Sequence, residues 1–160
     1  MPVIEASDHS YLLAESDREV DVPEEIPNAM AAGGDGAVSI VTGTDMGPVD
    51  VAVQVLNSAP VVDVDAWDEV VEVSVTTAEE LHLLAWDFSP PEDDVPPLAT
   101  TPGSYRVRVH ARGRDRAHAA GPVVEEALEQ HLIQIWPAAV GAEQVLKASD
   151  EFGDLMGRRP

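Results

Sequence analysis

The sequence predicts an all-β protein, an antiparallel β-sandwich or partly open barrel of about seven strands with one or two short helices. Three observations favour this fold class. Apolar and polar residues alternate in several segments, turn residues separate most of these segments, and helical periodicity is scarce. With 160 residues, of which 44% are hydrophobic, we expect one domain over residues 1–156 and a disordered tail over 157–160.

Seven segments are predicted to be strands. In residues 49–55, valine occupies every second position, which is typical of a strand with one buried face. In residues 105–112, Tyr, Val, Val and Ala alternate with Arg, Arg, His and Arg after the turn sequence Pro102-Gly103. The other five are rich in β-branched or aromatic residues and lie at 10–14 (the weakest), 38–41, 67–75, 81–88 and 132–136.

Helices are expected only as short pieces. Residues 142–148 are the better candidate, residues 23–32 can hold a helix that Pro27 limits, and residues 123–130 fit either a helix or an approach to the next strand. Residues 89–102 are rich in proline and include an acidic run, so we expect an exposed loop there.

The charge is strongly acidic and unevenly distributed. The chain has 30 Asp and Glu against 9 Lys and Arg, a formal net charge of −21, and residues 1–104 hold 22 of the acids and a single basic residue, Arg18. A negative surface disfavours nucleic acids and anionic membranes. It favours docking to a basic protein, although an acidic surface can also serve solubility alone.

The motifs of common enzyme classes are missing from the sequence. Without cysteine there is no disulfide, thiolate zinc site or cysteine nucleophile, and no histidine pair has the spacing of zinc hydrolases. Residues 63–69 contain four acids, but Asp68 stands where a calcium-binding EF-hand loop needs glycine. There is no nucleophile elbow, phosphate-binding loop or dinucleotide fingerprint. We therefore expect a protein that is not an enzyme and has no metal or cofactor.

Apolar runs and the first residues of the chain bear on location and membrane association. No apolar run is long enough to form a membrane helix, and the first ten residues lack the basic residues of a secretory signal. The sequence thus predicts a cytoplasmic protein with no membrane partner.

Five arginines between residues 106 and 116 form the only basic cluster. Three of them, with His110, fall on one face of the predicted 105–112 strand. They can bind an anion or an acidic partner, but we favour cross-strand pairing with Glu69 or Glu72. By the same alternation, His82 and His110 are expected to face solvent.

Aromatic and acidic residues supply the candidate partner-binding surface. Two or three of the tryptophans at 67, 86 and 136 are expected in the core, and an exposed one can anchor a partner. Trp86, at the mouth of the proline-rich loop, is the preferred anchor. The candidate partner-binding residues are Asp63, Asp65, Trp67, Asp68, Trp86, Asp87, Glu92, Asp93 and Asp94.

Five segments carry a family resemblance: Gly43-Thr44-Asp45-Met46, the valine strand, and residues 65–72, 102–109 and 132–137. In this order they resemble a group of uncharacterised actinobacterial proteins, which in turn resemble the ComJ type, the inhibitor of a DNA-entry nuclease. The resemblance covers about residues 38–137 and depends on strand and turn signatures. The stretch 112–130 is longer and richer in Arg and Ala than the group's pattern.

The resemblance implies a β-sandwich that inhibits another protein and carries no catalytic residues. In a nuclease inhibitor, the acids of 92–94 or of 63–68 would replace nucleic-acid phosphates in a basic cleft. Our first hypothesis is therefore an acidic inhibitor or immunity-type protein that binds a basic partner such as a nuclease or toxin. A small-molecule or sugar-binding β-sandwich module and a structural component of an assembly are the alternatives. A concave pocket lined by a tryptophan would favour the sugar-binding module.

Overall fold

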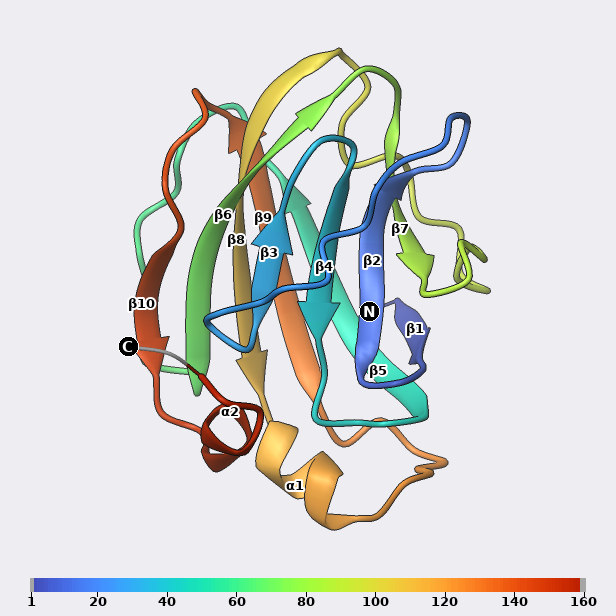
Figure 1. Cartoon of the computed structure of the whole chain (residues 1–160), viewed down its shortest axis with the longest axis vertical. Coiled ribbons are helices and arrows are strands. Elements are labelled where there is room, and N and C mark those ends of the chain that lie inside the picture. The colour runs from blue at the N-terminus through green and yellow to red at the C-terminus, as the bar shows by residue number, and fades with distance from the viewer. Residues whose placement is uncertain (1, 159–160) are drawn as a thin grey trace.

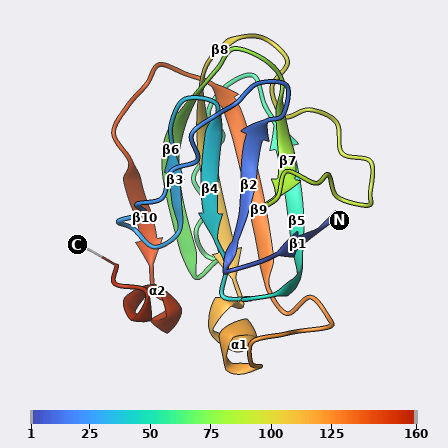
Figure 2. The same cartoon turned by 45° about the vertical axis from the view of Figure 1, so that its right-hand side comes forward.

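The protein is a two-layered β-sandwich. The computed structural model describes residues 2–158, which contain ten strands in two sheets and two short helices. The four-stranded sheet lies in front of the six-stranded sheet, and both helices lie at one end of the sandwich (Figures 1 and 2). The predicted β-rich fold with one or two short helices is confirmed, and the ten strands exceed the seven that the sequence predicted.

The larger sheet has a mixed strand order. In space it runs β1 (Val3–Ala6), β5 (Gly47–Val55), β9 (Gln130–Pro137), β8 (Gly103–Arg112), β6 (Glu69–Thr77) and β10 (Gln144–Ala148). The β5–β9 pair is parallel, with Val51 opposite His131. The wholly antiparallel arrangement that we predicted is therefore wrong at this pair, because the long connection from β5 to β9 returns the chain in the same direction.

The smaller sheet is antiparallel and approaches the larger one at one edge. Its order is β3 (Ala31–Gly33), β4 (Ala37–Val41), β2 (Ser10–Glu15) and β7 (Leu81–Ala85). Backbone hydrogen bonds join Thr76 of β6 to Gly34 and Gly36, just beyond β3. Within residues 2–158 neither sheet closes on itself, so the arrangement of the two sheets is sandwich-like.

The core lies between the sheets and is mostly aliphatic. Val49 and Val51 of β5 are fully buried there, as the alternation predicted, whereas Val55 at the end of the strand is 60% exposed. Tyr11 is the one fully buried aromatic residue of this cluster in the described chain. The three tryptophans lie outside the cluster, so the expectation that they fill the core is wrong.

The outer face of β8 is buried by side chains and chain segments that cross it. Arg106 Nε and Arg108 Nε donate to the two carboxylate oxygens of Glu72, at 3.1 and 2.9 Å. Terminal N–H groups of the two guanidiniums also donate to the backbone carbonyls of residues 60, 61, 141 and 142. The predicted cross-strand pairing with Glu72 is confirmed. The same cover leaves His110 only 2% exposed, so its predicted solvent exposure is wrong.

None of the three candidate helical segments forms a helix, and residues 123–130 instead lead into β9. Residues 142–148 supply β10, which pairs with the free edge of β6 from Glu69 to Glu72. Residues 23–26 have no regular secondary structure, residues 27–30 form a turn in which Ala29 N–H donates to the Ile26 carbonyl, and β3 begins at Ala31. The residues Ala, Glu, Gln, Leu and Lys prefer helices, but the open edge of β6 overrides this preference. A strand that pairs with β6 satisfies the backbone N–H and C=O groups of that edge, whereas a surface helix would leave them unpaired.

The observed helices, α1 (Arg114–Ala119) and α2 (Glu151–Leu155), lie where no helix was predicted. Asp150 caps α2 by accepting the Gly153 N–H, and α1 follows Gly113, whose φ is 87°. Neither helix is long and apolar enough to cross a membrane, a finding that covers residues 2–158.

The predicted tail begins at Gly157. Arg158 forms ion pairs with Glu69 and Asp150, at 2.8 and 3.0 Å, so this residue is held against the domain. Residues 159 and 160 of that prediction lie outside the described residues.

Candidate functional site

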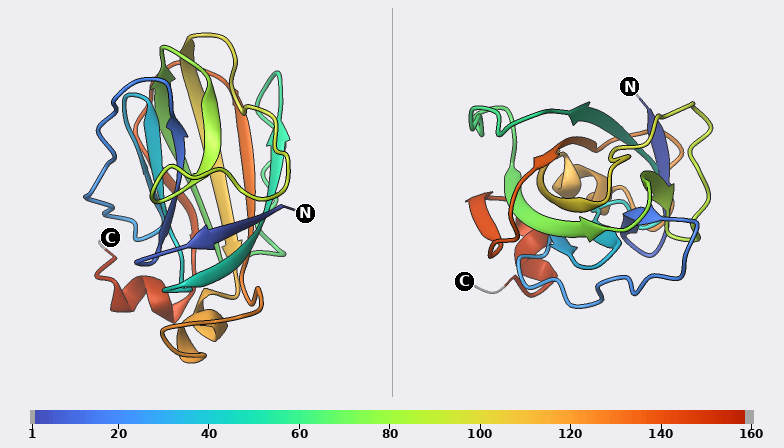
Figure 3. Two further views of the ribbon diagram at one scale, coloured as in Figure 1. Left: turned by 90° about the vertical axis from the view of Figure 1, so that its right-hand side faces the viewer. Right: turned by 90° about the horizontal axis from the view of Figure 1, so that it is seen from above.

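A groove lies along β1 at the open side of the sandwich. It has a volume of about 730 Å³, and its walls are residues 3–7, 46–47, 85–87, 89–93 and 123–124. Figure 3 shows β1 on this side together with the segment that follows β7. We call this feature the β1 groove.

The segment after β7 is folded into a tight turn that fixes one wall. Ala85 N–H donates to the Ser89 carbonyl and Phe88 N–H donates to the Ala85 carbonyl. Phe88 has a φ of 68°, a left-handed value that is uncommon for an aromatic residue. Hydrogen bonds from Ser89, first from its hydroxyl and then from its N–H, hold the pKa of Asp87 below its usual value. Asp87 is therefore anionic at neutral pH beside Trp86.

The groove combines exposed apolar side chains with acids. Trp86 is 55% exposed, Met46 is 50% exposed and Val123 is 63% exposed. Four acids lie among the wall residues: Glu5, Asp87, Glu92 and Asp93. None of the described wall residues is Lys, Arg or His. The site is thus an apolar strip within a negative field, which suits a cation with an apolar stem or a flat ring.

The structure brings together part of the predicted surface. Trp86, Asp87, Glu92 and Asp93 all line the β1 groove. Asp94 instead lines a neighbouring hollow of about 250 Å³ with Pro2, Val53 and Val95 among its walls.

Asp63, Asp65, Trp67 and Asp68 form a separate group on the outer face of the larger sheet. Trp67 packs under the Arg112 guanidinium, 4.8 Å from the ring centre, and against His110. Asp68 accepts the Gly113 N–H, whereas Asp63 and Asp65 are exposed. The His110 side chain beneath Trp67 is buried, and this burial is the main cause that lowers its pKa below the usual value. Trp67 and Asp68 thus hold the ends of β6 and β8 in place.

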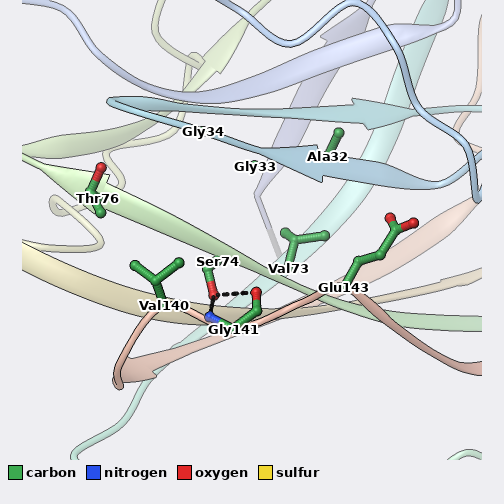
Figure 4. A pocket seen from close by; sticks show the side chains of 9 residues that line it. All are labelled: Ala32, Gly33, Gly34, Val73, Ser74, Thr76, Val140, Gly141 and Glu143. Carbon is green, nitrogen blue, oxygen red and sulfur yellow. Dashed lines mark hydrogen bonds between the residues drawn. The ribbon is translucent and has the colours of Figure 1, made fainter.

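A second hollow lies where β3 approaches β6 (Figure 4). Its volume is about 300 Å³, and glycines 33, 34 and 141 supply much of its wall. The Ser74 hydroxyl accepts from Gly141 N–H and lies 3.3 Å from the Gly141 carbonyl, and Glu143 accepts from Asn28. Its polar side chains are satisfied by the protein, so this hollow is a weaker candidate.

Sequence reasoning missed a buried chain of Tyr11, His131, Glu129 and Thr44. The Tyr11 hydroxyl lies 2.7 Å from His131 Nδ1, and His131 Nε2 lies 2.6 Å from Glu129 Oε2. Thr44 donates to Glu129 from both its N–H and its hydroxyl.

The pKa directions agree with this chain of hydrogen bonds. Burial and then the charge of Glu129 raise the pKa of Tyr11 well above its usual value. Burial also opposes ionisation of Glu129, but the His131 and Thr44 contacts lower its pKa overall. All four residues are fully buried, so the chain of hydrogen bonds lies out of contact with solvent and links β2 to β9 inside the domain.

A second missed network joins the two helices to β6. Arg114 pairs with Asp150, and Arg158 pairs with both Asp150 and Glu69. Glu69 Oε2 is buried without a hydrogen-bond partner among the described residues. Burial raises the pKa of Glu69 to about 7. No signal in the sequence placed these residues together, because they come from segments far apart in the chain.

Comparison with family models, curated protein sequences and solved structures finds no match to this chain. In residues 2–158, no group of three or more His, Asp or Glu side chains has the arrangement of a metal site. The function is therefore inferred from the residues and the charge of the β1 groove.

Proposed function

We propose that the protein is a non-enzymatic binding protein whose β1 groove receives a basic segment of a partner protein and thereby inhibits that partner. The observation that carries this proposal is the half-exposed Trp86 in a groove whose walls include four acids and no described basic residue. A lysine or arginine side chain can lie on the indole ring while its charge meets a carboxylate.

The charge of the whole chain supports the same partner. A net charge of −21 attracts a basic protein over distances longer than any single contact and speeds its encounter with the groove. The resemblance to the nuclease inhibitors supports a nuclease as the partner, since nuclease clefts are basic. Inhibition then follows if the acidic surface covers such a cleft.

The test compares the wild-type protein with two charge-matched variants. The groove variant carries Asp87→Asn, Glu92→Gln and Asp93→Asn, and the control carries Asp17→Asn, Asp21→Asn and Glu24→Gln at exposed positions outside the groove. Each of the three proteins is immobilised on a resin and exposed to native cell lysate. The retained proteins are eluted with rising salt and identified, and the activity of each is then titrated with the free wild-type protein.

We expect the wild type and the control variant to retain one basic protein that the groove variant does not retain. The activity of that basic protein should fall to zero near one equivalent of the wild-type protein. A nuclease among these would be assayed directly on DNA. Equal retention and inhibition by all three proteins would contradict a role for the groove.

A second candidate function follows from the shape of the same site. A concave groove with an exposed Trp86 also suits a sugar ring stacked on the indole. That function predicts quenching of tryptophan fluorescence by a neutral oligosaccharide, independent of salt. The basic-partner function predicts no such quenching and a strong salt dependence of binding.

A further inference from the structure

One edge of β1 has free backbone groups that face away from its partner strand. β1 is the edge strand of the larger sheet and pairs only with β5. Val51 N–H donates to the Pro2 carbonyl, so alternation along an antiparallel pair directs the backbone of Ile4 and Ala6 toward β5. The N–H and C=O groups of Val3 and Glu5 therefore point outward.

The residue opposite Glu5 agrees with this assignment. Glu5 is opposite Pro48, which has no N–H to donate to β1. A proline is tolerated there because this position of the pair makes no hydrogen bond. Among the described residues no hydrogen bond to the backbone of Val3 or Glu5 is formed from outside the β1–β5 pair.

Both residues line the β1 groove. Glu5 is exposed and Val3 is half-buried, and the groove that they line lies beside this free edge. Unpaired strand edges bind extended segments through main-chain hydrogen bonds, while side-chain pockets provide specificity.

We propose that the basic segment of the partner binds in an extended conformation, as an added strand hydrogen-bonded to Val3 and Glu5 of β1. This inference rests on the proposed function and specifies its binding mode. Lysine or arginine side chains of the segment meet the carboxylates of the groove, and intervening apolar side chains meet Trp86 and Met46. A helical segment would leave the edge groups unpaired, because its own backbone is already hydrogen-bonded.

The probe is a labelled, end-capped octapeptide that alternates lysine and valine, and its binding is measured by fluorescence anisotropy at low salt. Two further peptides carry N-methyl groups on one or the other alternate set of amides. N-methylation keeps the charges and side chains but removes donors from one edge of the strand.

We expect one of the two methylated peptides to bind at least tenfold more weakly than the parent, and the other to bind nearly as well. Val3→Pro, which removes an outward N–H, should weaken binding of the parent peptide at least tenfold. Binding should also slow hydrogen exchange of the Val3 and Glu5 amides and leave that of Ile4 unchanged. The exchange measurement needs no variant, so it stands even if Val3→Pro fails to fold.

The outcomes separate this inference from the proposed function. The parent peptide and both methylated peptides could bind equally well and with salt dependence, without slower exchange of the Val3 and Glu5 amides. That result overturns strand addition and leaves the basic-partner function standing. Binding lost in the groove variant but kept in its charge-matched control supports the groove itself. No binding of the peptide to wild type overturns both.

Discussion

The guanidinium of Arg114 holds the carboxylate of Asp150 with two parallel hydrogen bonds, and both side chains are almost completely buried. Nε lies 2.7 Å from Oδ2, and the second nitrogen lies 3.0 Å from Oδ1. Arg114 begins α1 and Asp150 caps α2, so this one pair joins the two helices beneath the sandwich.

Breaking this pair from one side should be strongly destabilising. Asp150→Ala leaves the buried Arg114 charge without its partner, and we expect a loss of about 3–5 kcal/mol in the free energy of unfolding. Urea denaturation followed by circular dichroism measures it. In the double variant with Arg114→Met, the loss should be at least about 1 kcal/mol smaller than the sum of the single losses. Additive losses would show that the two residues do not interact.

Glu69 should make stability depend on pH. Its pKa is raised from 4.5 to about 7 in the folded state, so the folded protein holds a proton that the unfolded chain has released between these values. The contribution of Glu69 to the free energy of unfolding is therefore fully present below pH 4.5 and is lost as the pH rises through 7.

We expect the stability of wild type relative to Glu69→Gln to fall by about 2 kcal/mol between pH 5 and pH 8. Urea midpoints at both pH values give this difference. Parallel pH profiles for the two proteins would mean that Glu69 titrates normally.

Gly33 and Gly34 offer a matched pair for testing the contact between the sheets. A Cβ at Gly33 would lie 2.0 Å from the Ser74 carbonyl oxygen, which is part of the β6 backbone and cannot yield easily. A Cβ at Gly34 would meet its nearest neighbour, Pro23, at an ordinary 3.7 Å. We expect Gly33→Ala to lower stability by about 1–3 kcal/mol. Gly34→Ala should change stability by less than about 1 kcal/mol. A similar response to both substitutions would contradict this close approach of β3 to β6.

Trp86 should matter for binding and not for folding. Because Trp86 is 55% exposed, Trp86→Ala should change stability by about 0.5 kcal/mol at most. It should weaken binding of the basic partner by about 2 kcal/mol or more, which is roughly thirtyfold. Trp136 is 5% exposed beneath Arg108, so Trp136→Ala is the contrasting control, expected to lose about 3 kcal/mol of stability. Unchanged partner affinity in Trp86→Ala would remove the indole from the proposed site.

The fold was predictable from the sequence where alternation was strong. Valine at every second position of β5 and the Tyr–Val face of β8 predicted both strands and their buried sides. β3 has only three residues and β1 only four, too few for a periodic signal. The parallel pairing of β5 with β9 depends on the path of the intervening chain, which no local pattern encodes.

The candidate site was predictable only in part, for a physical reason. Trp86 and the acids of the proline-rich loop are close in sequence, so the sequence alone groups them. The opposite wall comes from β1, about 80 residues earlier in the chain, and its free backbone edge depends on strand order. The burial of His110 is not predictable in this way, because alternation shows which side of a strand a residue takes but not whether later segments cover that side.

The central position of β8 and β9 in the larger sheet also constrains when the chain can fold during synthesis. All four strands of the smaller sheet lie before residue 104, but the first 102 residues supply only β1, β5 and β6 of the larger sheet, and β5 and β6 are not neighbours. A ribosome-bound chain therefore cannot complete its core until Pro137 has left the exit tunnel. The first 104 residues carry a net charge of −21, and charges of one sign on such unfinished chains repel one another.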